Sequence, residues 1–257
     1  MTATEHPPSP VVSDRVAPHT PLTSYYGSES ERHGYVVDLF NKSAAHYNSI
    51  ERIFGNFGLW YRGFSLKRAG MRPGMHVLDV AMGTGAVARN IVKIVGPTGS
   101  VTGCDPSPGM IAQARRWFSG PVSRGVADAL PFVDDHFDFV TMGIALRHVN
   151  DLATTFGEYF RVLKPGGTMW ILEGHVPDSK IGMGLTRFMW AKVVPGMTYA
   201  FTGNRDAKVL MDYYWDTVEF SAPKDTILDT MRRVGFENPT YRMAHPVCEY
   251  VGKKPLR

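Results

Sequence analysis

The stretch HVLDVAMGTGAVARNIVKIV, residues 76–95, decides the fold. It opens with an apolar run, HVLDVA, which is typical of a short buried strand. Gly83, Thr84 and Gly85 follow, and the apolar spacing of the remaining residues predicts a helix. Glycine lets the backbone approach a ligand closely, and the first N–H groups of the following helix point at that ligand. The stretch therefore predicts a strand, a ligand-binding turn and a helix.

Strands and helices continue to alternate after residue 95. The expected strands are SVTGCD, VSRGVAD, FDFVTMG and GTMWILE, and the expected helices between them are SPGMIAQARRWF and DLATTFGEYFRVL. Regular alternation implies crossover connections and a mostly parallel sheet that is covered on both faces. Ligands bind beyond the carboxyl ends of the strands in such sheets. The predicted fold class is α/β, a doubly wound sheet.

Four regions are expected from changes in composition and pattern. Residues 1–33, rich in Pro, Ser and Thr, predict a flexible tail, and residues 34–72 predict N-terminal helices. Residues 73–257 form the main domain, closed by the two strands PTYRMA and VCEYVGK. Residues 176–222 interrupt the alternation with aromatic and methionine-rich helices, which we interpret as an inserted cap.

Composition restricts the class of protein. The chain has 257 residues, of which 44% are hydrophobic, enough for one substantial core. A net charge of +4 without a run of basic residues gives no indication of nucleic-acid binding. Two cysteines are too few for a disulfide scaffold, and no signal core or membrane-length apolar run is present. The expectation is a reduced, cytoplasmic protein without integral membrane association.

An acidic residue on the next strand reduces the number of possible ligand classes. Asp105 follows the glycines by about 20 residues, where a carboxylate accepts hydrogen bonds from ribose hydroxyls. This leaves a nicotinamide dinucleotide, S-adenosylmethionine, or a tight turn without a ligand. Asp128 and Ala129, placed to border an adenine, together with the aromatic insert and the closing strand pair, favour S-adenosylmethionine.

These residues together resemble the class I S-adenosylmethionine-dependent methyltransferases, and more closely the ubiquinone/menaquinone biosynthesis C-methyltransferase family. The matching segments are FNKSAAHYN, VLDVAMGTGAVA, GCDPSPGMIAQAR, DALPFVDDHFDFVTMGIALRHVND and RVLKPGGTMWILE. The resemblance covers roughly residues 36–254. It implies a seven-stranded sheet in the order 3-2-1-4-5-7-6, with the last-inserted strand antiparallel.

The resemblance also implies the cofactor-binding residues. Thr84 would hold the methionine end of the cofactor together with Gly83 and Gly85, with Asp79 behind them and Tyr47 closing over it. Asp105 would bind the ribose, and Gly143 would approach the cofactor from the fourth strand. The adenine would lie against four residues, which are Pro106, Met110, Asp128 and Ala129.

Three histidines mark departures from the family pattern. The family usually reads FGLRN where this chain has IALRH, so that Arg147 is kept and His148 is new. His175 and His245 stand at two further departures, and all three are expected at the substrate edge of the sheet. We take Arg147, His148, His175 and His245 as candidate catalytic residues. Solvent-exposed loop histidines are the alternative, and no spacing of ligands supports a metal site.

The predicted function is transfer of a methyl group from S-adenosylmethionine to a hydrophobic small molecule. Carbon is the favoured position, on an aromatic, quinone-like or isoprenoid acceptor of secondary metabolism, prenyl diphosphates included. The alternatives are O- or N-methylation of a natural product and a non-catalytic protein that retains the fold. The sequence leaves a homodimer open.

Overall fold

The computed structural model describes residues 15–53 and 57–256. Seven strands form one sheet in the order β3-β2-β1-β4-β5-β7-β6, and this confirms the predicted strand order. The strands are β1 (His76–Val80), β2 (Ser100–Asp105), β3 (Val122–Arg124), β4 (Phe137–Gly143), β5 (Leu163–Gly174), β6 (Glu237–Ala244) and β7 (Val247–Lys253). β7 runs antiparallel to both β5 and β6, whereas β1 to β5 pair in parallel.

Helices cover both faces of this sheet, as the alternation predicts. The sheet helices are α3 (Phe57–Arg68), α4 (Ala88–Val95), α5 (Pro108–Ala114), α6 (Leu152–Val162) and α10 (Lys224–Val234). α3 and α4 bury apolar side chains such as Leu66 and Ile91 against one face, and α6 and α10 bury Phe156 and Met231 against the other. Removal of this apolar surface from water is the main contribution to the stability of the fold.

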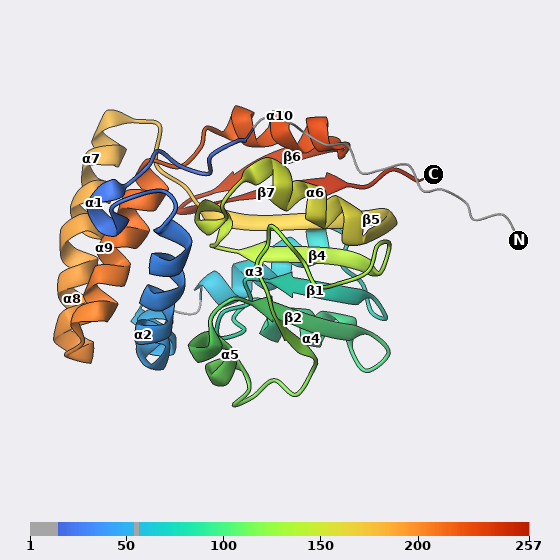
Figure 1. Ribbon diagram of the computed structural model, residues 1–257, viewed down its shortest axis with the longest axis horizontal. Coiled ribbons are helices and arrows are strands. Elements are labelled where there is room, and N and C mark those ends of the chain that lie inside the picture. The colour runs from blue at the N-terminus through green and yellow to red at the C-terminus, as the bar shows by residue number, and fades with distance from the viewer. Residues whose placement is uncertain (1–14, 54–56, 257) are drawn as a thin grey trace, which may run out of the picture.

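The remaining helices gather beside the carboxyl ends of the strands (Figure 1). They are α1 (Thr23–Tyr26), α2 (Arg32–Ile53), α7 (Lys180–Phe188), the π-helical turn η2 (Met189–Val193), α8 (Val194–Thr202) and α9 (Arg205–Glu219). α2 packs against α9 through buried residues that include Leu39, Leu210 and Tyr213. The cap expected over residues 176–222 thus corresponds to α7, η2, α8 and α9.

The expectation of a flexible tail is wrong for residues 15–33, while residues 1–14 lie outside the described residues. Val16 exchanges hydrogen bonds with the start of α6: its N–H donates to Asp151 Oδ1 at 2.7 Å, and its carbonyl accepts from Leu152 N–H at 2.9 Å. Thr20 N–H donates to Phe220 O at the end of α9, and Tyr26 is buried under the cap. The proline and serine content of this segment does not predict these contacts, because backbone groups, which every residue has, make most of them.

The described part of the chain contains no helix of the length and apolar character that a membrane crossing requires.

Candidate functional site

Two connected cavities lie at the carboxyl ends of β1, β2 and β4. The narrow pocket has a volume of about 100 Å³ and runs between α2 and the loops after β2 and β3. The chamber has a volume of about 360 Å³ and lies under the cap. The residues that line both are Tyr47, Ala81, Gly83, Gly143 and Ile144. These shared residues mark the junction at which ligands in the two cavities would meet.

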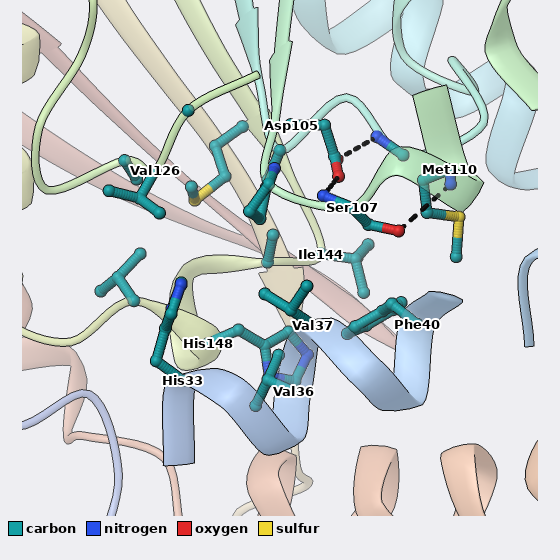
Figure 2. Close-up of a pocket in the computed structure, with 18 of the residues that line it drawn as sticks. His33, Val36, Val37, Phe40, Asp105, Ser107, Met110, Val126, Ile144 and His148 are labelled. Atoms are coloured by element: carbon teal, nitrogen blue, oxygen red, sulfur yellow. Dashed lines mark hydrogen bonds between the residues drawn. The ribbon is translucent and has the colours of Figure 1, made fainter. Parts of the chain in front are cut away.

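The narrow pocket is enclosed by two opposite walls (Figure 2). Val36, Val37 and Phe40 project from α2 on one side, and Ser107 and Met110 stand on the other. The Ser107 hydroxyl caps α5 by accepting the Met110 N–H at 3.1 Å. The wall thus combines an apolar face with fixed polar groups, as small-molecule sites generally do.

The glycine turn has the backbone conformation that the sequence predicts. Gly83 has φ of +57°, and a Cβ atom there would meet nothing within 4 Å. Gly85 has φ of +86°, and a Cβ atom there would lie 2.3 Å from the Trp117 ring. Trp117 Nε1 donates to the Thr84 carbonyl at 2.9 Å and fixes the turn from behind. Gly83 and Thr84 line the cavities, whereas Gly85 serves close packing.

Asp105 lies at the end of β2, directly behind Gly83. Its Oδ2 accepts the Gly83 N–H and its Oδ1 accepts the Ser107 N–H, both at 2.8 Å. Each carboxylate oxygen keeps a further lone pair, which is the arrangement that a pair of vicinal hydroxyls requires. Burial raises the pKa of Asp105 to about 6, and the two backbone donors oppose this rise.

Asp79 lies behind the turn and lines neither cavity. It is fully buried on β1, and the Thr141 hydroxyl of β4 donates to its Oδ1 at 2.7 Å. Burial raises the pKa of Asp79 to about 7. Asp79 therefore contacts the neighbouring strand and supports the turn, and it does not contact a ligand in either cavity.

Asp128 lines the narrow pocket but already accepts several internal hydrogen bonds. Asn150 donates to it from the backbone at 3.1 Å and from Nδ2 at 3.0 Å, and the Thr155 hydroxyl donates at 2.7 Å. The carboxylate thereby ties the loop after β3 to the start of α6. A hydrogen bond to an adenine amino group would have to compete with these donors.

Ala129 does not line the narrow pocket itself but an adjoining, more open hollow that shares Pro106 and Val126 with it. Its N–H donates to the Val126 carbonyl in a tight turn, which rotates it away. Val126 and Ala127 line the pocket in its place, together with Pro106. Sequence reasoning placed the correct loop at this wall but chose the wrong residue on it, because the turn reverses direction within three residues.

The backbone at the junction is unusual at Ile144. This β-branched residue has φ of +58°, a conformation that few residues other than glycine adopt. Its N–H donates to the Leu172 carbonyl at 2.6 Å. A Cβ atom on the preceding Gly143 would lie 2.5 Å from Val87. Together these constraints bring β4 close to the glycine turn, and no motif signalled Ile144.

The chamber has mainly apolar and aromatic walls. Besides the shared residues, it is lined by Tyr61, Arg62, Met82, Thr84, Ala86, Val87, Leu172, Trp190, Met211, Tyr214, Pro246 and Val247. Trp190 and Tyr214 are stacked, with ring centroids 5.0 Å apart and planes 25° apart. Burial raises the pKa of Tyr214 to about 12, while the charges of Arg147 and Arg62 oppose the rise. Sequence reasoning had not singled out Arg62, which no motif marks.

Arg147 is not available to a substrate, contrary to the expectation. It is 3% exposed, lines neither cavity and pairs with Glu173 at the end of β5. Its Nε donates to the Thr217 hydroxyl at 2.9 Å, and its guanidinium lies 4.4 Å from the centre of the Tyr214 ring. Arg147 therefore joins β4, β5 and α9 beneath the chamber.

His148 lines the narrow pocket and not the chamber. Its ring stacks on Tyr213 at 5.6 Å and meets the edge of Phe40 at 5.3 Å. Within the described residues, neither ring nitrogen has a hydrogen-bond partner, and both are shielded from solvent. Burial, and then the nearby charges of Arg147, His19 and Arg32, hold the pKa of His148 well below its usual value. The ring is thus neutral, which makes it a weak base.

His175 and His245 lie together but apart from His148. Their ring centroids are 6.3 Å apart, and both line a shallow hollow beside Asp178 and Met243. All three histidines stand at strand ends on one edge of the sheet, but they do not line one cavity. The residues that follow these strand ends line different cavities. His175, after β5, and His245, before β7, line this hollow, whereas His148, after β4, lines the narrow pocket. No group of three or more metal-ligating side chains was found among the described residues.

Comparison with known proteins identifies close similarity to one enzyme family. The model of the ubiE/COQ5 methyltransferase family matches residues 27–250. A ubiquinone/menaquinone biosynthesis C-methyltransferase from Shewanella halifaxensis is 34% identical, covering 80% of this chain and 84% of its own. A demethylmenaquinone methyltransferase from Symbiobacterium thermophilum is also 34% identical, covering 88% and 95%.

Solved structures support the fold independently. An S-adenosylmethionine-dependent methyltransferase from Thermotoga maritima superposes with a TM-score of 0.58 at 21% identity, covering 84% of this chain and 99% of its own. One from Aquifex aeolicus gives 0.57 at 18% identity, covering 80% and 96%.

Proposed function

The chain belongs to the ubiE/COQ5 methyltransferase family and is an S-adenosylmethionine-dependent enzyme, and from this premise we propose that it methylates a ring carbon of a hydroquinone-type acceptor with an apolar substituent. The observation that carries the proposal is the chamber, whose walls include the stacked rings of Trp190 and Tyr214 next to the cofactor-side junction. The names of both relatives, which refer to quinone biosynthesis, agree with a planar acceptor of this kind.

The described residues fit the cofactor. Gly83 presents open space at the position of a side chain, and Asp105 keeps a lone pair on each oxygen for the two ribose hydroxyls. We assign the adenine to the far end of the narrow pocket, between Met110 and Val126. The methionine end then lies at the junction, near Tyr47, Gly83, Thr84 and Gly143, with Asp79 and Gly85 supporting the turn from behind.

The chamber walls suit an aromatic acceptor. A planar ring can stack on the Trp190–Tyr214 pair, with Met211 and Leu172 bordering an apolar substituent. Offset stacking of aromatic rings contributes about 0.5–1.5 kcal/mol beyond area burial. Burial keeps the Tyr214 hydroxyl protonated at neutral pH, since its pKa is about 12, so that this hydroxyl can donate to an acceptor oxygen.

The chemistry that remains for the protein is alignment and charge stabilisation. When bound, the cofactor supplies a methyl group on a sulfonium, which is already electrophilic. Arg62 lines the chamber and would favour a phenolate on the acceptor, which makes the adjacent ring carbon nucleophilic. That carbon would take the methyl group, and the electron pair of the carbon–sulfur bond would stay with the cofactor. The same carbon then loses its proton to water, which restores the aromatic ring. The junction places donor and acceptor within reach of each other.

The test is an acceptor assay with isotopically labelled S-adenosylmethionine under anaerobic conditions. We expect a prenylated 1,4-naphthohydroquinone to receive the label on a ring carbon, located by mass spectrometry and NMR. The oxidised quinone should receive none, because its ring carbon is not nucleophilic. Label on oxygen, or turnover of a prenyl diphosphate but of no hydroquinone, would contradict the proposal. Aromatic hydroxyl compounds of secondary metabolism could also form a phenolate, and they should be tested as acceptors in the same assay.

We further propose that His148 acts as a neutral hydrogen-bonding group on the narrow pocket. Two shielded ring nitrogens without partners in the described chain cost stability unless a ligand satisfies them. His148→Leu should weaken S-adenosylmethionine binding about tenfold, corresponding to ~1.4 kcal/mol, and should affect kcat less, because His148 lines the pocket assigned to the cofactor and not the chamber. His148→Gln, which can still hydrogen-bond, should stay within about threefold of wild type. Wild-type turnover and affinity in the leucine variant would leave His148 with a packing role only.

A further inference from the structure

The outer face of the cap presents an unusual concentration of exposed apolar side chains. We define this cap face by seven residues of α7, η2 and α8, which are Ile181, Leu185, Phe188, Met189, Met197, Tyr199 and Phe201. Ile181 is 88% exposed and Phe201 is 73% exposed. In Figure 1, α7 and α8 lie at the left edge of the molecule, beyond the carboxyl ends of the strands.

The cap face is not explained by packing within the chain. Neither α7 nor η2 contributes a single buried residue, although the apolar positions on α7 recur at 181, 185 and 188, as on one face of a helix. Isolated exposed apolar residues are ordinary, but seven of them on the uninterrupted helical segment of residues 180–202 favour an interaction site.

The charges around the cap face indicate what covers it. From Ser179 to Arg205 the chain has no Asp or Glu, and it has four cations. Arg187 pairs with Glu219 of α9, whereas Lys180, Lys192 and Arg205 have no salt bridge to another described residue. A two-fold interface between copies would place this patch against itself and bring like charges together. Apolar side chains interleaved with lysine and arginine are instead the pattern of a helix that lies on a lipid surface.

We propose that the cap face is a peripheral binding site for the surface of an anionic lipid bilayer. The apolar side chains enter the boundary between headgroups and acyl chains, and Lys180 and Lys192 contact the anionic headgroups. Trp190 of the same helical segment lines the chamber from the inside. A bilayer on the outer side of the cap would therefore hold an apolar acceptor within one helix diameter of the chamber. The binding itself is independent of the proposed reaction.

The experiment is vesicle flotation of the full chain, without acceptor. Wild type should float with vesicles of phosphatidylcholine containing phosphatidylglycerol, and should bind vesicles of phosphatidylcholine alone at least tenfold more weakly. The Leu185→Ser/Phe188→Ser double variant should lose at least tenfold in binding to the anionic vesicles. The Lys180→Gln/Lys192→Gln variant should lose most of the preference for phosphatidylglycerol.

The matched control is Val133→Ser/Leu256→Ser, which removes two apolar side chains away from the cap that are at least as exposed as Leu185 and Phe188. It should bind vesicles as wild type does, and S-adenosylmethionine binding should show that every variant is folded. Absence of binding by wild type, or equal losses in the control, would overturn the proposal. It would also be overturned if light scattering detected a dimer that the Leu185→Ser/Phe188→Ser variant dissociates, because the cap face would then bind a second copy. Because no readout involves methyl transfer, these outcomes are separate from failure of the proposed reaction.

Discussion

The Asp105→Ala variant should bind S-adenosylmethionine at least about 100-fold more weakly than wild type. Each hydrogen bond from a ribose hydroxyl to a carboxylate contributes about 1.5–3 kcal/mol, and two such bonds therefore exceed the ~2.7 kcal/mol that corresponds to 100-fold in affinity. The Gly83 and Ser107 N–H groups also lose their acceptor, so the turn is less well positioned. Isothermal titration calorimetry measures the effect directly.

Two controls separate ribose binding from a general effect of removing charge. Asp229→Ala removes an exposed acid on α10 and should leave affinity unchanged. Asp105→Asn should bind better than Asp105→Ala, because the amide oxygen still accepts one hydrogen bond.

The pH profile gives a further control. Since the pKa of Asp105 is raised to about 6, wild-type affinity should fall as the pH drops through 6 and the carboxyl becomes protonated. Asp105→Asn should have a shallower profile, because it lacks the carboxyl group that titrates near pH 6. An affinity within twofold of wild type for Asp105→Ala would mean that the ribose lies elsewhere.

The glycine turn and the alternation of strands and helices could be predicted because each depends on a local sequence pattern. Gly83 has to adopt a positive φ, and the apolar runs of the strands are short and regular. The packed segment of residues 15–33 could not be predicted. Its contacts are backbone hydrogen bonds to Asp151, Leu152 and Phe220, and composition carries no information about partners so distant in sequence.

In the candidate site too, residues positioned by local sequence could be predicted, whereas residues positioned by distant contacts could not. Asp105, Gly83 and Thr84 line the two cavities, and the short, conformationally constrained turn made this position predictable. Arg147 was misassigned because its partner, Glu173, stands 26 residues later on another strand, and only the folded sheet brings the two together. For the histidines, sequence could indicate which sheet edge they approach, but not which of two cavities a ring enters. Trp190 and Tyr214 belong to the aromatic and methionine-rich insert, and nothing in the sequence separates the insert residues that face the chamber from those of the cap face.

Glu173→Leu should destabilise the fold by about 3–5 kcal/mol, since it leaves the buried Arg147 guanidinium without a counter-charge. Urea denaturation measures this loss in the free energy of unfolding. Glu173 also accepts the Gly174 N–H at 2.7 Å and approaches the Arg147 N–H, so the turn after β4 loses its anchor as well. Because Arg147 is also in contact with Tyr214, the chamber wall should loosen, and acceptor KM should rise more than cofactor Kd.

The double variant Arg147→Met/Glu173→Leu distinguishes a buried ion pair from a cavity effect. Replacing both charges with apolar residues of similar volume removes the cost of desolvating them, and such replacements are often neutral in stability. The double variant should therefore be more stable than either single variant, whereas a pure packing defect would make the two losses add.

The exposed pair of Lys42 and Asp38 on α2 provides the comparison, and Asp38→Asn there should cause no measurable change because solvent already screens both charges. If Glu173→Leu unfolds at the same urea concentration as wild type, the pair does not hold β4, β5 and α9 together. Arg147 would then be free to turn toward the chamber, and the substrate-orienting role expected from sequence would have to be reconsidered.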